Sequence, residues 1–210
     1  MDEIHKPRSP GIGHNSRPDG YQWRRYCWTR ARAGLIGRRL PLEVVRQRVR
    51  RARELGLAYP AYASILMGSG RDILGFLYTC DAIGLRLRRR LELPPSKVQA
   101  LGAIVRCDRL IVAPREEPAD AFRAEVQEVS GLPFAAGLHE PDLRLGWASA
   151  RAELREVLAP INLRADAVVL VGTEKAHADW ADAVDFARCI PPEVCFGQAP
   201  GDQPEAASSN

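Results

Sequence analysis

The stretch "AVVLVG", residues 167–172, is the clearest strand signal in the chain. It is a short, continuous apolar run that ends at a glycine, which is typical of a strand buried within a parallel sheet. Thr173 follows as the expected N-cap of a helix over residues 174–188. The end of the chain is therefore predicted to pass from a buried strand directly into a helix.

The sequence around this unit repeats the same alternation. Strands are expected at 109–114, 132–138 and 194–197, and helices at 118–131 and 142–160. The alternating order predicts a small, mostly parallel sheet with covering helices, Rossmann-like in the loose sense if its crossovers are right-handed. We therefore expect an α/β domain over residues 107–197.

The chain before residue 107 has a helical period instead. Residues 21–106 are predicted to form a basic, all-helical region. Residues 1–20 and 198–210 are rich in Gly, Pro, Ser and other small or polar residues without periodicity, and we expect a disordered leader and a disordered tail. The helices expected in the basic region span residues 22–33, 41–56, 61–67, 71–85 and 96–105.

Charge divides the chain in the same place. Residues 1–106 hold 21 Lys and Arg against 8 Asp and Glu, a balance of +13, and residues 107–210 hold 9 against 18, a balance of −9. Such asymmetry predicts a different partner for each half, or two halves that attract each other. The five cysteines are scattered and form no CxxC pair, so we expect reduced thiols in a cytoplasmic protein.

The helix expected at 42–55 has arginine over most of its solvent arc. Arg46, Arg50 and Arg53 fall on one face, beside an apolar stripe expected to point inward, and Arg48 and Arg51 fall on the far side. Guanidinium groups on one face suit the phosphates of a nucleic acid. The alternative is an ordinary solvated face, neutralised by acids of the second half.

Other basic segments would extend such a surface. Arg24 and Arg25 lie in "WRRYCWTRAR" (23–32), where aromatic rings could stack on bases or could instead dock on the core. Arg88 and Arg89 lie in "RLRRR" (86–90), which follows an expected helix end, where the helix dipole favours cations without any function.

A second candidate site lies at the strand ends of the α/β half, because ligands bind at the carboxyl ends of parallel strands. The side chains there could act in acid–base or metal chemistry, although polar loops are the simpler interpretation. The sequence contains no GxGxxG after a strand, no Walker loop, no GxSxG and no HExxH. The residues of this alternative site are Glu116, His139, Glu140, Thr173 and Glu174.

Three functional hypotheses follow. The first is a non-catalytic, cytoplasmic regulatory or accessory protein that binds a polyanion, preferably nucleic acid, or an acidic protein surface, without cofactor or metal. The second is an enzyme that acts at the strand ends. The third is an adaptor or assembly subunit whose oppositely charged halves contact protein partners or like chains. No apolar run of 18 residues and no secretory leader is found, so no membrane partner is expected.

Overall fold

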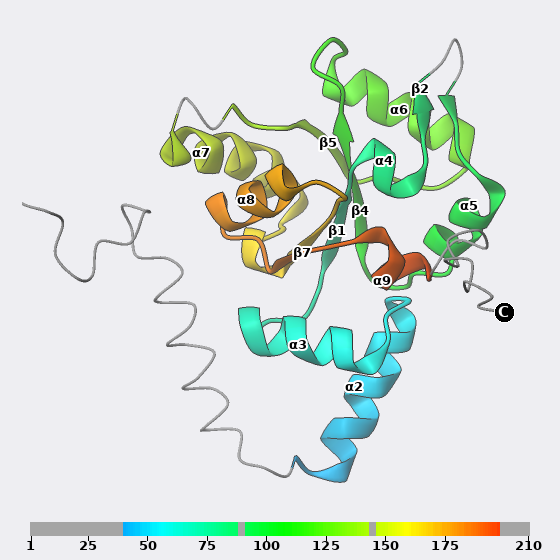
Figure 1. The fold of residues 1–210 in the computed structure, drawn as a ribbon, viewed down its shortest axis with the longest axis vertical. Helices are drawn as coiled ribbons and strands as arrows, with labels where there is room; N and C mark the ends of the chain where they lie inside the picture. The colour runs from blue at the N-terminus through cyan, green and yellow to red at the C-terminus, as the bar shows by residue number, and fades with distance from the viewer. Residues whose placement is uncertain (1–39, 88–90, 143–145, 198–210) are drawn as a thin grey trace, which may run out of the picture. The chain divides into compact units, whose positions relative to one another are not determined.

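A five-stranded parallel sheet forms the centre of the fold (Figure 1). The computed structural model describes residues 40–87, 91–142 and 146–197. The sheet order is β5-β4-β1-β6-β7, and every neighbouring pair is parallel. The strands are β1 (Gly75–Tyr78), β4 (Asp108–Ala113), β5 (Ala136–His139), β6 (Val168–Val171) and β7 (Arg188–Ile190).

The central strands are buried on both faces, which explains why they are continuous apolar runs. All four residues of β1 and all four of β6 are buried. Successive side chains point to opposite faces of a strand. Phe76 and Tyr78 belong to one core cluster together with Val169, whereas Leu77 and Leu170 belong to the other.

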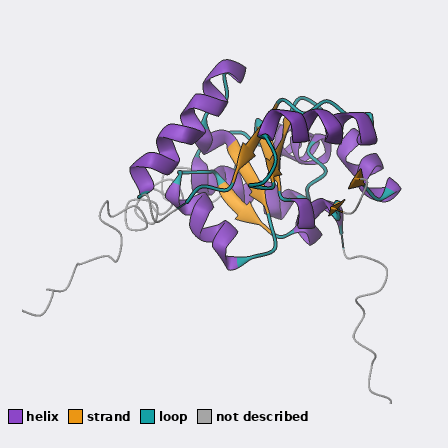
Figure 2. Ribbon diagram, turned by 90° about the horizontal axis from the view of Figure 1, so that it is seen from above, coloured by secondary structure: helices purple, strands orange, loops and turns teal. Residues whose placement is uncertain are grey.

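Helices cover both faces of the sheet (Figure 2). The Leu77 face packs against α7 (Trp147–Leu158) and α8 (Lys175–Ala183). Around the Phe76 face lie α2 (Leu42–Glu54), α3 (Tyr59–Ser69), α4 (Cys80–Ile83), α5 (Pro95–Gly102), α6 (Ala119–Ser130) and α9 (Pro192–Phe196). Short elements complete the chain, namely β2 (Arg86–Leu87) paired with β3 (Leu91–Glu92), and the 3-10 turns η2 (Ala159–Ile161) and η3 (Ala165–Ala167).

The α/β class and the parallel sheet are confirmed, but the all-helical assignment of residues 21–106 is wrong. The expected helix at 71–85 is instead the strand β1, followed by the short helix α4, and β2 and β3 also lie in this region. β1 is the middle strand of the sheet and pairs with both β4 and β6. Gly75 lets Leu163 pack closely on the start of β1, because a Cβ atom at this position would lie 2.8 Å from a methyl carbon of Leu163.

Two smaller predictions also need correction. Residues 194–197 do not form the expected strand, since residues 194–196 belong to helix α9, which begins at Pro192. The last strand among the described residues is β7. Proline at the first position of a helix is favourable, since its ring fixes a helical φ and its missing N–H is not needed there. The N-cap of α8 is Glu174 rather than Thr173. The helix expected at 174–188 ends at Ala183, and the strand expected at 132–138 begins at Ala136, while β4, α6 and β6 lie close to the predicted bounds.

Candidate functional site

α2 packs through a face that includes part of the predicted apolar stripe and is turned toward Arg51. Its buried residue is Ala52, and Leu55, which follows the helix, is buried as well. Leu42, expected to point inward, is 62% exposed, whereas the Arg51 side chain, expected in solvent, is only 13% exposed. Part of the apolar stripe is therefore open to solvent, and one arginine is directed toward the protein.

Arg51 joins α2 to the amino ends of β1 and β4. Its Nε donates to Asp72 at 2.8 Å, and its Nη2 donates to the carbonyl oxygens of Ile73 at 2.8 Å and Arg106 at 3.1 Å. Its Nη1 donates to Glu54 and to the Val105 carbonyl oxygen, both at 3.2 Å. A guanidinium with this many partners has a structural role, so Arg51 cannot also contact a phosphate.

Glu54 receives a second cation at the same place. The exposed guanidinium of Arg106 donates to the Glu54 carboxylate, and this hydrogen bond is the largest cause that lowers the pKa of Glu54 below its ordinary value. Tyr62 on α3 donates its hydroxyl to Asp72 at 3.0 Å. These side chains connect α2, α3 and the entries of two strands, and we call Arg51, Glu54, Tyr62, Asp72 and Arg106 the amino-end network.

The outer side of α2 carries the three predicted arginines. Arg46, Arg50 and Arg53 are exposed and have i, i+4 and i+7 spacing, which places them on one helical face. Arg46 pairs with Glu43 at 2.7 Å, and both of these side chains are largely exposed. Neither Arg50 nor Arg53 forms an ion pair within the described residues. We call Arg46, Arg50 and Arg53 the arginine face of α2.

Among the described residues, no acid of the second half forms an ion pair with the arginine face. The acids paired with α2 arginines, Glu43, Glu54 and Asp72, all belong to the basic half. An ion pair between the two halves does exist, from Arg71 to Asp166 at 2.7 Å, but it lies away from α2 in sequence. The remaining predicted polyanion-binding residues, Arg24, Arg25, Arg88 and Arg89, lie outside the described residues.

The alternative site at the strand ends is not joined by contacts. Glu116 and Thr173 are exposed, and Glu174 is held in the capping box of α8, where its side chain accepts from the His177 N–H and His177 accepts from the Glu174 N–H. His139 lies 3.3 Å from the carbonyl oxygen of Ala113 through its Nδ1. Within the described part of the chain, no ion pair or hydrogen bond links any two of Glu116, His139, Glu140, Thr173 and Glu174.

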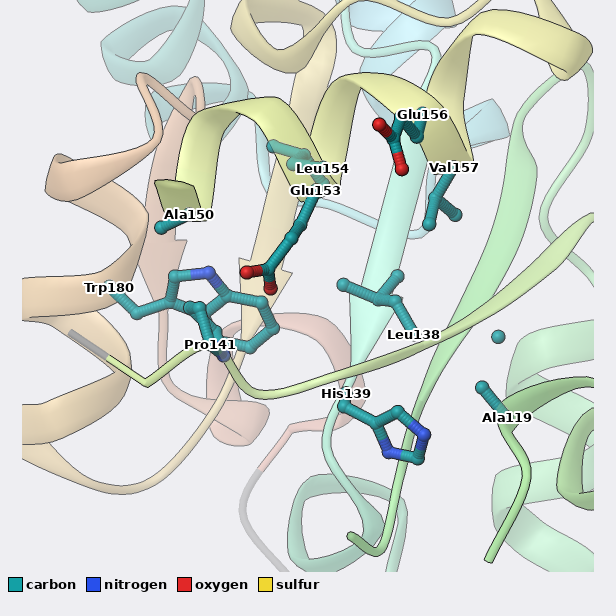
Figure 3. Close-up of a pocket in the computed structure, with 11 residues that line it drawn as sticks. Ala119, Leu138, His139, Pro141, Ala150, Glu153, Leu154, Glu156, Val157 and Trp180 are labelled. Carbon is teal, nitrogen blue, oxygen red and sulfur yellow. The ribbon is translucent and has the colours of Figure 1, made fainter. Parts of the chain in front are cut away.

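One of these residues does line a cleft, which has a volume of about 230 Å³ and lies between β5 and α7 (Figure 3). His139 lies at its edge, and two carboxylates that the sequence analysis did not single out, Glu153 and Glu156, project from α7. The i, i+3 spacing on an amphipathic helix was visible in the sequence, but it did not show that β5 and Trp180 would lie opposite. The apolar lining includes Leu138, Ala150, Leu154, Val157 and Trp180.

The described thiols are not poised for nucleophilic chemistry. Burial raises the pKa of Cys107 and of Cys195 to about 12, and the pKa of Cys80 and of Cys189 to about 11. The thiolate is the reactive form, so these side chains are largely inert at neutral pH. In residues 40–87, 91–142 and 146–197, no group of three or more His, Cys, Asp and Glu side chains is arranged to hold a metal ion.

The helices that the structure describes include none with the length and apolar character needed to cross a membrane. Comparisons with protein-family models, with curated proteins and with solved structures found no significant match to this chain.

Proposed function

We propose that this protein is a non-catalytic regulatory or accessory protein that binds nucleic acid through the arginine face of α2. The observation that carries the proposal is the exposure of Arg46, Arg50 and Arg53 on one side of the helix, with Glu43 as the one acid paired to them among the described residues. An exposed pair such as Arg46–Glu43 contributes little free energy, so a phosphate can replace the carboxylate at small cost.

The geometry suits a phosphate backbone rather than a base edge. At 1.5 Å rise per residue, the three arginines extend along about 10 Å of α2. A guanidinium presents a planar fork of donors that matches phosphate oxygens, and each phosphate contact releases condensed counterions. Contacts to the backbone carry no sequence information, so we expect binding that depends on salt much more than on base sequence.

An acidic protein surface is the second candidate, because the arginine face lies beside exposed apolar surface. Leu42 is 62% exposed, and Val45 and Val49 are only half-buried. Protein interfaces combine arginine with apolar side chains and exclude other charges from their centre. This candidate predicts that Leu42 contributes to binding, whereas phosphate binding does not require it.

The experiment is a titration of a fluorescein-labelled 20-base-pair duplex, followed by anisotropy between 50 and 200 mM salt. If three phosphates contact the arginine face, these contacts contribute about −2.7 to the slope of log affinity against log salt. The variant R46Q/R50Q/R53Q should lose this part of the slope and should bind roughly a hundredfold more weakly at 50 mM salt.

The matched control removes the same charge elsewhere. R115Q/R155Q/R164Q replaces three exposed arginines of the second half and should retain most of the wild-type salt slope. Equal binding by the two triple variants, or no detectable binding by the wild type at 50 mM salt, would refute the proposal. The variant L42S separates the two partners, because a loss of duplex binding on this change would favour the protein-surface candidate.

A further inference from the structure

The cleft between β5 and α7 is partly open to solvent and is lined mainly by apolar side chains. Its volume of about 230 Å³ exceeds the roughly 150 Å³ of an apolar cavity that holds benzene. The walls are largely apolar, and they include the buried side chains of Leu138 and Leu154 and the half-buried side chain of Val157. A molecule slightly larger than a benzene ring therefore fits this space and contacts mostly carbon atoms.

Trp180 closes one end of this cleft. It is 1% exposed and packs edge to face on Phe186, with ring centroids 5.8 Å apart. Its indole N–H has no hydrogen-bond acceptor among the residues that the structure describes. This N–H is a donor and cannot bind a cation, so the part of Trp180 that could attract positive charge is its ring.

Two carboxylates give the cleft its charge. Glu153 and Glu156 are exposed residues of α7 that line the cleft. Figure 3 shows the Glu153 carboxylate beside Trp180 and Pro141, whereas the Glu156 carboxylate lies apart from it, beside the α7 ribbon near Val157. The hydroxyl of Ser149 donates to Glu153 at 3.1 Å, which leaves further lone pairs free to accept. Neither carboxylate forms an ion pair within the described residues.

Two arginines of the flanking helices pair with acids outside the cleft lining. Arg123 on α6 lies 3.6 Å from Asp120, and it also donates to the side chain of Gln127 and to a backbone carbonyl. Arg151 on α7 pairs with Asp185 at 3.2 Å. Arg123 and Arg151 therefore have partners other than Glu153 and Glu156.

We propose that the cleft binds a small organic cation, an ammonium group on an apolar body of about ten heavy atoms. The ammonium donates to the Glu153 carboxylate, beside the ring of Trp180, the aromatic side chain that best attracts cations, and Glu156 adds negative charge at the same cleft. The apolar body lies against Leu138 and Val157. This binding site is separate from the arginine face of α2, and neither proposal depends on the other.

The test uses three probes with one apolar body and different charges. They are 2-phenylethylamine, which is a cation at neutral pH, the neutral 2-phenylethanol, and the anion 3-phenylpropionate. Binding is followed in nitrogen–proton correlation spectra, where each of the four tryptophans gives one indole signal and the variant W180F identifies that of Trp180. We expect the amine to shift the Trp180 signal with a dissociation constant of roughly 1 mM, a value typical of a ligand of this size.

Two variants of equal charge separate binding from general electrostatics. E153Q/E156Q should weaken the amine at least fivefold and leave the affinity for 2-phenylethanol unchanged. E125Q/E128Q removes two exposed carboxylates from α6 and should leave the amine affinity unchanged. If W180F does not fold, the variant V157W replaces it. A tryptophan in place of the half-buried Val157 should fill the cleft, shift the Trp180 indole signal and abolish amine binding.

The proposal is overturned by any of three results. The first is an amine that leaves the Trp180 signal unmoved at 20 mM. The second is an alcohol that binds as tightly as the amine, and the third is an equal loss of amine affinity in both glutamate variants.

Discussion

The two ends of the parallel sheet are held together by different chemistry. At the amino ends of β1 and β4, the amino-end network contains two ion pairs between residues far apart in sequence, Arg51–Asp72 and Arg106–Glu54. At the carboxyl ends of β1 and β6, Thr79 caps α4, and Glu174 and His177 cap α8, all through partners three residues away. Long-range charge pairs therefore fix helices to the amino end. At the end where α/β proteins usually bind ligands, the helix caps are local, and the side chains of Cys80 and His139 reach other strands only through backbone carbonyl oxygens among the described residues.

The largest effect is expected at Arg51. The variant R51A removes five hydrogen bonds. The Asp72 carboxylate loses its arginine partner, and three backbone carbonyl oxygens lose a hydrogen-bond donor. We expect the free energy of unfolding, measured with urea, to fall by about 3 kcal/mol. R50A on the outer face of α2 is the control and should change it by less than about 0.5 kcal/mol.

A lysine at the same position sharpens this prediction. R51K keeps the charge but cannot reach several oxygens at fixed angles, so it should recover only a minor part of the loss. If R51K were as stable as the wild type, the network would act through charge alone, and the geometric explanation would be wrong.

The thiols at the two ends provide the second comparison. Cys107 precedes β4 and has a pKa of about 12, and Cys80 follows β1 and has a pKa of about 11, both raised above the ordinary 9.0 by burial. Folding therefore favours the protonated thiols, and their contribution is complete below pH 9 and is lost as the pH rises toward the folded values. For Cys107 we expect a loss of about 2 kcal/mol between pH 9 and pH 11.

Urea unfolding across this pH range tests the thiol prediction. C107A should flatten the decrease in unfolding free energy more than C80A does, because the Cys107 pKa is raised further. Identical pH profiles for C107A and the wild type would contradict it.

The smallest effect is expected at the carboxyl end. The hydroxyl of Thr79 accepts from the N–H of Ala82 at 3.3 Å and caps the four-residue helix α4. T79A should therefore cost about 1 kcal/mol, the usual value for an N-cap, while T79S should be close to wild type. A loss as large as that of R51A would remove the distinction between the two ends.

The sequence predicted the parallel sheet because its second half alternates clearly between apolar runs and amphipathic helices. It did not predict β1, because "GFLY" (75–78) is a four-residue apolar run, and periodicity cannot separate a buried strand from a buried helix at this length. The strand is stabilised by β4 and β6, which lie far along the chain, so the information that decides its structure is not local.

The candidate sites were predicted only in part, for related reasons. The arginine face was visible from spacing, but the orientation of Arg51 depends on Asp72 and on carbonyl oxygens that follow from the tertiary fold. The cleft needs the side chains of β5, α7 and α8 together, and Trp180 lies 27 positions after Glu153. A residue pattern on one helix cannot show which element will lie opposite.

The position of β1 at the centre of the sheet has a consequence for synthesis of the chain. Gly75 pairs with Val168, which follows 93 positions later, so one edge of β1 has no native partner until β6 has left the ribosome. At 5–20 residues per second this interval is roughly 5 to 20 s. During that time the apolar edge is open to non-native pairing, and the rate of translation between the two strands becomes a determinant of the yield of folded protein.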